Sequence, residues 1–336
     1  MEYDISVIIP AYNAEKYLEN AVKSVINNKR QHTAAVEIII AENGSTDHTW
    51  QIAEQLQRQY ENVHAVQSEK GVSHARNKGL EIASGMWICF LDADDQMTEE
   101  AFSAMTEIIE QKASDLFVFG YWKNGQKILP DIDEKISLPE KKAELIKNPT
   151  RYLAVWGKLF SRIIIQKYGI QFNPTLALSE DSDFLIHYMR YCNNISFSDA
   201  CVYRYNTQGS SSTRGFSGDK KAGYLRAIHS TQEKIADQEK CVKHAFAHYT
   251  FMQMNLIMVK DVFCKENKIS FTKKCKDLEN TCEESVFKDA LSEISLRECV
   301  SPRLLPAILC KLHLWHLCGM VYWLRDIQNR YRSSKI

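Results

Sequence analysis

The sequence predicts an α/β fold with a mostly parallel central sheet, followed by a helical C-terminal region. Short apolar runs alternate with helical patterns up to residue 119, and this alternation is typical of βαβ units with parallel strands. From about residue 219 the pattern is helical to the end. The 336 residues are 45% hydrophobic, which is enough for a sizeable core.

Five apolar runs are expected to form strands. They cover residues 5–9, 36–41, 63–66, 87–91 and 116–119. The first strand should stop at Pro10, because proline donates no hydrogen bond to a sheet.

Helical patterns separate these strands. Apolar residues recur on one face after Asn13, and asparagine often caps a helix N-terminus. Further helices are expected at residues 46–59, at residues 72–83 with Gly85 as the C-terminal cap, and after Thr98.

The alternation weakens beyond about residue 125, and the polar residues 126–150 are expected to be loop. We therefore divide the chain into three parts, residues 1–125, 126–216 and 217–336.

The overall charge argues against nucleic-acid binding. Lys plus Arg and Asp plus Glu each number 42, so the formal net charge is zero, whereas nucleic-acid binding usually needs a clustered basic surface. The ten cysteines include no Cys-x-x-Cys pair and are expected to be free thiols in a reducing compartment. The N-terminal apolar run is short and lacks the basic start of a secretory signal, which predicts a cytoplasmic protein.

Three segments that could contact a ligand follow the ends of predicted strands. They are Pro10-Ala11-Tyr12, Glu42-Asn43 and Asp92-Ala93-Asp94-Asp95. Ligands of open parallel sheets bind beyond the carboxyl ends of the strands. These segments should therefore meet at one edge of the sheet.

The segment from Asp92 to Asp95 puts three carboxylates into four residues. Mg²⁺ prefers carboxylate oxygens and typically takes one or two of them together with substrate phosphates and water. The alternative is a turn at the start of a helix, since Asp favours such turns. This segment alone does not decide between the two.

Four motifs together resemble those of the family 2 glycosyltransferases, which have the GT-A fold and bind nucleotide sugars. They occur in the family's order and at similar spacings: Val7–Asn13, Glu42–Asp47, Gly71–Gly79 and Phe90–Asp95. Any one motif is weak, but the ordered set is specific. The resemblance implies that the first part of the chain binds the donor and that the second part carries the catalytic base and binds the acceptor.

The resemblance implies a site for a nucleoside-diphosphate sugar, with a UDP-sugar as the expected donor. Pro10 and Tyr12 would line the nucleobase pocket, although Tyr12 could instead pack on the sheet. Glu42 and Asn43 stand where the family has two Asp residues, one of which contacts the base or the ribose. This departure leaves the choice of nucleobase open.

Basic and acidic residues complete the expected donor site. Arg76 would reach the diphosphate or the ribose, unless it is a solvated cation on its helix. Asp94 would hold Mn²⁺ or Mg²⁺ with help from Asp92, and Ala93 between them is assigned to the donor site. The metal would neutralise the departing diphosphate, whereas Asp95 is expected only to cap the turn.

A weaker match lies in the second part. Residues 155–160 and Arg162 look like a segment common in bacterial members. In the family, a Glu-Asp pair then precedes a helix, and its Asp removes the proton of the acceptor hydroxyl. By this resemblance Asp181 is the base, Glu180 orients it, and Asp183 is the nearest competitor. The alternative is that the acidic run only opens a helix with favourable charge.

Arg204 and Arg214 follow at the place where family members carry a loop that closes over the donor. Either arginine could grip phosphate, or both could be plain surface cations. The serine-rich residues 210–213 are predicted to be a mobile loop.

The C-terminal region is apolar over residues 301–324, but a lysine and two histidines interrupt it, so no membrane span is predicted. Aromatics beside cations suit a helix lying on an anionic membrane surface. An ordinary packing helix or a homodimer contact is the alternative. A zinc site is not expected at the four histidines and cysteines, because they spread around the helix: Cys310, His313, His316 and Cys318.

The sequence therefore predicts an inverting, metal-dependent glycosyltransferase acting on a glycan or a lipid-linked glycan, in bacterial surface-polysaccharide synthesis. It would be cytoplasmic, at the inner face of the plasma membrane if its tail binds lipid. A polyprenyl-phosphate glycosyltransferase is an alternative that needs no base, because its acceptor is already an anion. A non-catalytic module that keeps only the fold is another. A dehydrogenase is disfavoured, since no Gly-x-Gly-x-x-Gly follows the first strand.

Overall fold

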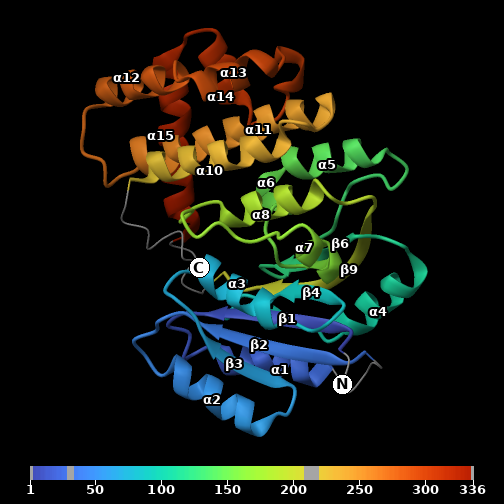
Figure 1. Ribbon diagram of the computed structural model, residues 1–336. Helices are drawn as coiled ribbons and strands as arrows, with labels where there is room; N and C mark the ends of the chain where they lie inside the picture. The colour runs from blue at the N-terminus through green and yellow to red at the C-terminus, as the bar shows by residue number, and fades with distance from the viewer. Residues whose placement is uncertain (1–2, 29–33, 208–218, 334–336) are drawn as a thin grey trace. The chain divides into compact units, whose positions relative to one another are not determined.

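The chain forms two compact units in the computed structural model (Figure 1). The sheet unit comprises Met1–Lys141 and Ala154–Arg214, and the helical unit comprises Lys142–Leu153 and Gly215–Ile336.

The structure describes most of the chain. The described ranges are 3–28, 34–207 and 219–333. The serine-rich segment 210–213 and Arg214 lie outside the described residues, so the expectations for them stay predictions.

Nine strands of the described residues form the central sheet. They follow the order β3-β2-β1-β4-β8-β6-β9-β5, and β7 pairs with β6. Their bounds are β1 Ile5–Ala11, β2 Val36–Glu42, β3 Val63–Gln67, β4 Trp87–Phe90, β5 Gln96–Met97, β6 Leu116–Lys123, β7 Gln126–Ile128, β8 Lys158–Ser161 and β9 Ile195–Tyr205.

The predicted α/β fold with a mostly parallel sheet is confirmed. β1 pairs in parallel with β2 and β4, β2 with β3, and β6 with β9. β8 runs antiparallel to both β4 and β6. Every residue of β1 and β2 is buried, which is why these strands read as continuous apolar runs.

The prediction that Pro10 ends the first strand is wrong, because β1 continues through Pro10 to Ala11. The last pair between β1 and β4 is Ile8 with Phe90. The amide of Leu91 donates to the carbonyl of Ile8, so the backbone of Ile8 faces β4. The backbone nitrogen of Pro10, two residues further along the strand, faces the same way, but pairing with β4 has ended there. Its missing N–H therefore interrupts no ladder.

The helices of the sheet unit lie between the strands, within a few residues of the predicted positions in the first part of the chain. Their bounds are α1 Leu18–Asn28, α2 Thr49–Gln59, α3 Val72–Ile82, α4 Ala101–Gln111, α7 Arg162–Lys167 and α8 Glu180–Met189. The helix predicted after Thr98 is α4, and it buries Phe102, Met105 and Ile108.

Asn13 does not cap a helix, contrary to the prediction, since α1 begins only at Leu18. Asn13 has a positive φ of 48°, and its side chain binds the loop after β2. Asparagine is one of the few residues that tolerate this backbone region.

Residues 126–150 are not only loop, as was expected. They include β7 and two helices, α5 Leu138–Lys147 and α6 Pro149–Tyr152. The inner face of α5 is hard to read from sequence because it contains a charged residue. Lys141 is buried there and pairs with Glu134 at 2.9 Å.

The helical unit confirms the predicted C-terminal helices. Their bounds are α10 Lys220–Ile235, α11 Lys240–Ile257, η2 Met258–Val262, α12 Phe271–Cys282, α13 Ser285–Glu293, η3 Leu296–Glu298, α14 Leu305–Lys311 and α15 Trp315–Ser333. None of the described helices combines the length and the unbroken apolar character that a bilayer span requires.

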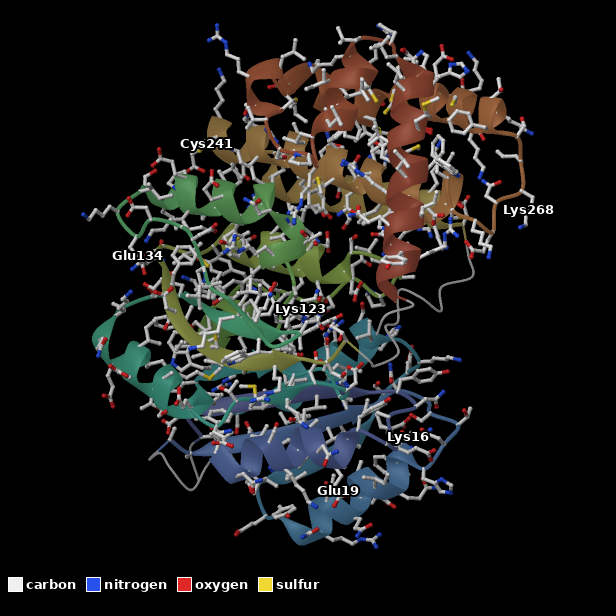
Figure 2. The ribbon with its side chains drawn as sticks, turned by 180° about the vertical axis from the view of Figure 1, so that it is seen from behind. Lys16, Glu19, Lys123, Glu134, Cys241 and Lys268 are labelled. Atoms are coloured by element: carbon white, nitrogen blue, oxygen red, sulfur yellow. The ribbon has the colours of Figure 1, made fainter. Side chains whose placement is uncertain are left out.

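Sulfur atoms gather among the helices of this unit (Figure 2). The Sγ atom of Cys310 lies 3.7 Å from that of Cys282 and 3.6 Å from that of Cys318. All ten cysteines are free thiols, as expected.

Candidate active site

The loops after β1 and β2 are joined by hydrogen bonds. The amide of Asn13 donates to Ser45 Oγ (3.0 Å), and the amide of Thr46 donates to Asn13 Oδ1 (2.8 Å). These bonds fix the edge of the sheet that carries Tyr12 and Glu42.

Glu42 ends β2 and Asn43 follows it, and both side chains are buried. Oε1 of Glu42 accepts from the amide of Ser45 (2.5 Å). Oδ1 of Asn43 is buried without a hydrogen-bond partner among the described residues. A buried acceptor without a donor is costly, so this oxygen is suited to receive an N–H or O–H from a ligand.

Tyr12 is 45% exposed, which argues against a ring packed on the sheet. The ammonium of Lys70 lies 5.4 Å from the centre of its ring. Pro10 is buried within β1. Of these two predicted nucleobase contacts, Tyr12 therefore has the accessible face.

The acidic loop after β4 is held by Tyr203 of β9. Its hydroxyl accepts from the amide of Asp92 (3.2 Å) and donates to Asp95 Oδ2 (2.5 Å). The amide of Asn206 donates to Asp95 Oδ1 (2.6 Å). Asp95 is thus a buried anchor of the loop, and burial raises its pKa to about 8. Ala93 is also buried.

The segment before β8 supports Tyr203. The ring of Trp156 stacks on that of Tyr203, with 4.7 Å between centroids. Gly157 has a φ of 65°, which glycine adopts readily. Lys158 Nζ is buried and donates to the carbonyls of Ala154 (2.7 Å) and Trp156 (3.4 Å). Burial lowers the pKa of Lys158 to about 7.

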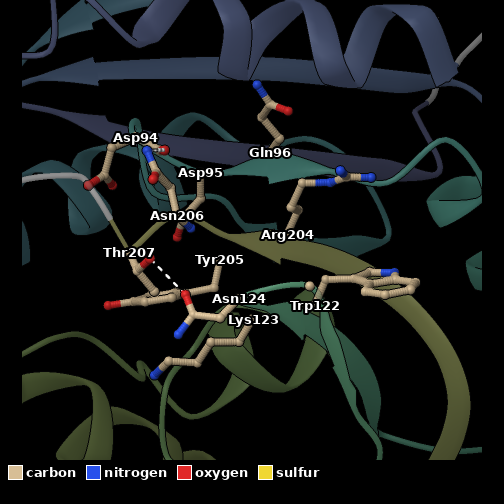
Figure 3. A pocket seen from close by; sticks show the side chains of 11 residues that line it. Asp94, Asp95, Gln96, Trp122, Lys123, Asn124, Arg204, Tyr205, Asn206 and Thr207 are labelled. Atoms are coloured by element: carbon tan, nitrogen blue, oxygen red, sulfur yellow. Dashed lines mark hydrogen bonds between the residues drawn. The ribbon is translucent and has the colours of Figure 1, made fainter. Parts of the chain in front are cut away.

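Asp94 lines a pocket of about 550 Å³ (Figure 3). The acidic loop, β5, the end of β6 with the turn after it, and the end of β9 with the residues after it supply its lining: Asp94, Asp95, Gln96, Trp122, Lys123, Asn124, Gly125, Arg204, Tyr205, Asn206 and Thr207. The ammonium of Lys123 lies 4.7 Å from the centre of the Tyr205 ring. The hydroxyl of Thr207 donates to Asn124 Oδ1 (2.8 Å), the dashed line in Figure 3. Cations and aromatic faces beside a carboxylate suit sugar and phosphate groups.

Arg76 of α3 joins three carboxylates from two segments of the chain, the acidic loop and the start of α8. Its Nη1 lies 2.6 Å from Asp181 Oδ1 and 3.3 Å from Glu180 Oε1, and its Nη2 lies 3.2 Å from Asp92 Oδ1. Its side chain is 4% exposed and lies over the ring of Phe172. Burial opposes the cation, but the charges of Asp181, Asp92 and Glu180 outweigh it and raise the pKa of Arg76.

This environment rules out the alternative of a solvated cation for Arg76. Both terminal nitrogens are engaged by carboxylates, and Nε is buried without a partner among the described residues. Arg76 therefore organises the acidic groups of the site.

Glu180 and Asp181 open α8, where the helix dipole favours negative charge. Ser179, just before them, has a φ of 62°. Asp181 is 22% exposed, whereas Asp183 is fully buried and out of reach of a substrate. Burial, and next the charge of Asp181, raise the pKa of Glu180 to about 7.

Carboxylates outnumber cations around Arg76. This part of the site contains two buried basic residues, Arg76 and Lys158. It contains four acidic residues: Asp92, Asp94, Glu180 and Asp181. Burial raises the pKa of Asp92 to about 6 and also raises that of Asp94. No side chain of the described residues binds the Asp94 carboxylate, which accepts a hydrogen bond from its own backbone amide. This oxygen set, with its excess of negative charge, fits Mg²⁺ or Mn²⁺.

The strand order places Asp94 between two halves of the site. β1 and β2, which carry Tyr12 and Glu42, lie on one side of β4, and β8, β6 and β9 lie on the other. The pocket is lined from β6 and β9 and includes none of the predicted nucleobase and ribose contacts.

Several residues of the site were not found from the sequence. Trp122 and Lys123 line the pocket, but the fifth strand was predicted to end at residue 119, four residues too early. An aromatic residue followed by a cation at the end of that strand, Trp122-Lys123, was the pattern that could have indicated a binding site. Arg204, one of the two arginines considered, does line the pocket.

Comparison with known proteins gives one matching family model. Residues 6–169 match the model described as Glycosyl transferase family 2. The uncharacterized glycosyltransferase EpsJ of Bacillus subtilis (strain 168) is 28% identical over 218 residues, which cover 62% of each chain. The chain therefore spans about three fifths of the length of this curated relative.

A second relative and a solved structure cover more of the chain. Poly(ribitol-phosphate) beta-N-acetylglucosaminyltransferase TarP of Staphylococcus aureus (strain N315) is 26% identical over 237 residues, 69% of this chain and 72% of TarP. The crystal structure of S. aureus TarS residues 1–349 in complex with UDP-GlcNAc superposes with a TM-score of 0.68 at 20% identity, covering 98% of this chain and 92% of the other. This likeness confirms a GT-A-like fold with C-terminal helices.

Proposed function

This chain belongs to glycosyl transferase family 2 through residues 6–169, and on that premise we propose that it is an inverting glycosyltransferase. It would move a sugar from a UDP-sugar to a hydroxyl of a surface glycopolymer. The observation that carries the proposal is the junction at Arg76, which joins Asp92 of the acidic loop to Glu180 and Asp181. Inversion needs a base on the face opposite the leaving group, and this junction brings a candidate base close to the candidate diphosphate site.

The proposed donor site is the edge formed by Tyr12, Glu42 and Asn43. The exposed ring of Tyr12 would stack on the base, and the unpartnered Oδ1 of Asn43 would accept an N–H from it. Glu42 would orient the base or the ribose. The buried Pro10 would lie beneath the nucleobase and line the bottom of its pocket. The TarS complex with UDP-GlcNAc and the activity named for TarP support a UDP-sugar.

Asp94, with help from Asp92, is proposed to hold Mn²⁺ or Mg²⁺. The Asp94 carboxylate lines the pocket, and Arg76 fixes the orientation of Asp92. When bound, the cation would neutralise charge on the departing diphosphate.

Asp181 is proposed to take the proton of the acceptor hydroxyl, with Glu180 as its positioning neighbour. Arg76 holds both carboxylates through Nη1, so their orientation is fixed before a substrate binds. Deprotonation turns the weakly nucleophilic hydroxyl into a group that can attack the anomeric carbon from the face opposite the diphosphate.

The pocket beyond Asp94 is proposed to bind the acceptor. Lys123 and Arg204 among its lining residues would pair with acidic or phosphate groups, and Trp122 and Tyr205 would contact sugar faces. The poly(ribitol-phosphate) in the name of TarP supports an anionic polymer as acceptor.

Two alternatives make different predictions. A polyprenyl-phosphate acceptor is already an anion, so Asp181→Asn would leave its rate nearly unchanged. A non-catalytic module would bind a nucleotide sugar without turnover.

Thermal shift with UDP and UDP-GlcNAc, each with and without Mn²⁺, tests the donor site. We expect a rise in Tm that needs metal and disappears in Asp94→Ala. Asp199→Ala, an exposed aspartate of β9, is the matched control and should behave like the parent chain. Equal stabilisation without metal would refute the metal role.

The base is tested separately, by a sugar-transfer assay of Asp181→Asn. Transfer that persists in this variant would refute the role of Asp181 as the base.

The C-terminal helices are proposed to rest on an anionic membrane surface. Residues 301–336 hold six Lys and Arg against one acidic residue, although the whole chain is neutral. Four apolar side chains of α15 are each about half exposed: Leu317, Met320, Trp323 and Leu324. Apolar side chains beside cations are typical of helices that lie in a membrane interface.

A further inference from the structure

The helical unit contains a second cluster of potential metal ligands, separate in the chain from the residues of the proposed active site. His244 and His248 lie on α11, and Glu298 ends the short helix η3. The Nε2 atom of His244 lies 2.6 Å from Glu298 Oε1, and that of His248 lies 3.2 Å from the same oxygen. Among the described residues, no other three His, Cys, Asp or Glu side chains bring their ligand atoms this close together.

The helix itself arranges the two histidines. Residues four apart on an α-helix lie on the same face, so His244 and His248 present their rings together, 5.3 Å apart between centroids. Two histidines at this spacing can bind one metal ion through the same face of a helix. The side chain of His248 is 8% exposed and that of His244 is 28% exposed, so the cluster is shielded on one side and open to water on the other.

Glu298 is held so that one oxygen remains for the histidines. Its Oε2 accepts from the amide of Ser295 (2.9 Å) and from its hydroxyl (2.8 Å), which forms a capping box. Its Oε1 points to both imidazoles. A carboxylate ligand that is itself fixed by hydrogen bonds is typical of metal sites.

A second carboxylate lies on the far side of one ring. Glu293 Oε2 is 3.9 Å from Nδ1 of His244, while Nε2 of the same ring faces Glu298. Histidine ligands commonly donate their second nitrogen to a carboxylate, and Glu293 lies on that side of the ring at an ion-pair distance that is longer than a hydrogen bond.

We propose that His244, His248 and Glu298 bind a zinc-type transition-metal ion, with water in the fourth position. Two imidazole nitrogens and one carboxylate oxygen are a ligand set that Zn²⁺ takes in a tetrahedral site with one open position. Nitrogen ligands disfavour Mg²⁺ and Ca²⁺. The site therefore differs in chemistry from the all-oxygen site proposed at Asp94.

The ion would clamp η3 onto α11. The ligands come from elements 50 residues apart in the chain, so binding energy is available only when the helical unit is folded. The proposed role of the ion is to hold η3 on α11, and sugar transfer is not expected to need it.

Zinc binding to the full-length chain tests the proposal. The protein is stripped with chelator, dialysed, and titrated with Zn²⁺ in excess Mg²⁺, so that oxygen sites are occupied. We expect about one Zn²⁺ per chain after gel filtration, and a Tm raised by about 5–10 °C when free Zn²⁺ is about 100 times its Kd.

His244→Gln and His248→Gln separate a metal site from a hydrogen-bonded cluster. The glutamine amide can still donate to Glu298, but it is a poor zinc ligand. Each variant should fold with nearly the parent Tm in chelator and bind Zn²⁺ roughly 100-fold or more weakly, since even the loss of an outer partner of a ligand costs about 10–100-fold. His229→Gln, an exposed histidine of α10, is the matched control and should bind like the parent.

Co²⁺ in place of Zn²⁺ gives a second readout that does not depend on stability. The visible spectrum should be that of a site with nitrogen and oxygen ligands, without the charge-transfer band of a thiolate. Unchanged zinc affinity in both glutamine variants, equal loss in His229→Gln, or a thiolate band would overturn the assignment.

Discussion

At the residue scale, Arg76 holds the acidic site together. Three carboxylates share its guanidinium, which is almost completely buried. Without the arginine, like charges would face one another at low solvent exposure. The residue therefore has a positioning role that its sequence motif did not reveal, because the motif suggested contact with the diphosphate.

Arg76→Met should destabilise the fold by about 3–5 kcal/mol, the usual cost of removing one partner of a buried ion pair. Burial already raises the pKa values of Asp92 and Glu180, and Arg76 opposes this rise, so in the variant both pKa values should rise further above their unfolded values. Below the unfolded pKa these carboxyls are protonated in both the folded and the unfolded variant, so they do not destabilise the fold. The folded variant loses stability as the pH rises through the raised pKa values. Denaturant unfolding should show a larger deficit near pH 8 than near pH 5.

Lys78→Met, on the same helix but in an exposed pair with Glu81, is the control for Arg76→Met and should cost less than about 1 kcal/mol. A deficit for Arg76→Met that does not change with pH would mean that packing on Phe172, and not charge, accounts for it.

The pair Glu180–Asp181 predicts a pH dependence of transfer. Burial raises the pKa of Glu180, the proposed positioning neighbour of the base, to about 7, so the Glu180 carboxylate forms only as the pH rises through about 7. If the ionised Glu180 positions Asp181, kcat/KM should fall below about pH 7 and level off above it.

Glu180→Gln removes the group whose pKa is raised to about 7, so the fall in kcat/KM near pH 7 should disappear. Asp181→Asn should abolish transfer at every pH. A profile in the parent chain that stays flat between about pH 5.5 and 8 would argue against this pair as the base.

At the element scale, two glycines allow α3 and β4 to approach β1. A Cβ on Gly79 would lie 2.4 Å from Ile8 Cγ2, and a Cβ on Gly85 would lie 2.6 Å from the backbone nitrogen of Ser6. A side chain can be removed by mutation, whereas a backbone atom cannot. The two contacts should therefore respond differently to a second substitution.

Gly79→Ala should destabilise the parent chain by about 1–3 kcal/mol, but it should be neutral or stabilising in an Ile8→Ala background, where the clash is gone and alanine favours the helix. Gly85→Ala should be destabilising in both backgrounds. A double-mutant cycle by chemical denaturation measures the coupling, and additive costs for Gly79 and Ile8 would contradict the close contact.

The exposed face of α15 gives another prediction at this scale. Co-sedimentation with vesicles containing anionic lipid should retain the parent chain and lose it at high salt, because lipid charge contributes to binding. Trp323→Glu should release the protein, while Gln328→Glu, an exposed position with the same added charge, should weaken binding only slightly. Concentration-dependent dimerisation that is lost in Trp323→Glu, without vesicle binding, would instead assign this face to a second copy.

At the scale of the whole molecule, the two units are expected to carry different ligands. Hydrogen exchange followed by mass spectrometry should show that UDP with Mn²⁺ slows exchange most in the acidic loop and at the start of α8. Zn²⁺ in excess Mg²⁺ should slow exchange most around His248 and Glu298. Strongest protection of the acidic loop by Zn²⁺ would show that zinc binds the oxygen site instead.

Much of the fold was predictable from the sequence. The strand and helix positions up to residue 119 follow from apolar periodicity, and the approach of Tyr12, Glu42 and Asp94 to one sheet edge follows from parallel pairing. β8 and β9 were missed because they do not continue the alternation of strands and helices seen in the first part of the chain. β8 pairs antiparallel with β6, and β9 pairs in parallel with β6. The helix α5 was missed because it buries two lysines, Lys141 and Lys142.

The sequence by itself therefore determined the order of the elements in the first part of the chain, the position of the acidic loop, and the family of the chain. Each of these depends on local periodicity or on short motifs. Only the tertiary structure decided that Arg76 binds Asp92, Glu180 and Asp181, and that His244, His248 and Glu298 meet. Contacts across 16 to 105 residues depend on strand register and on the placement of helices, and no local pattern of residues encodes either of these.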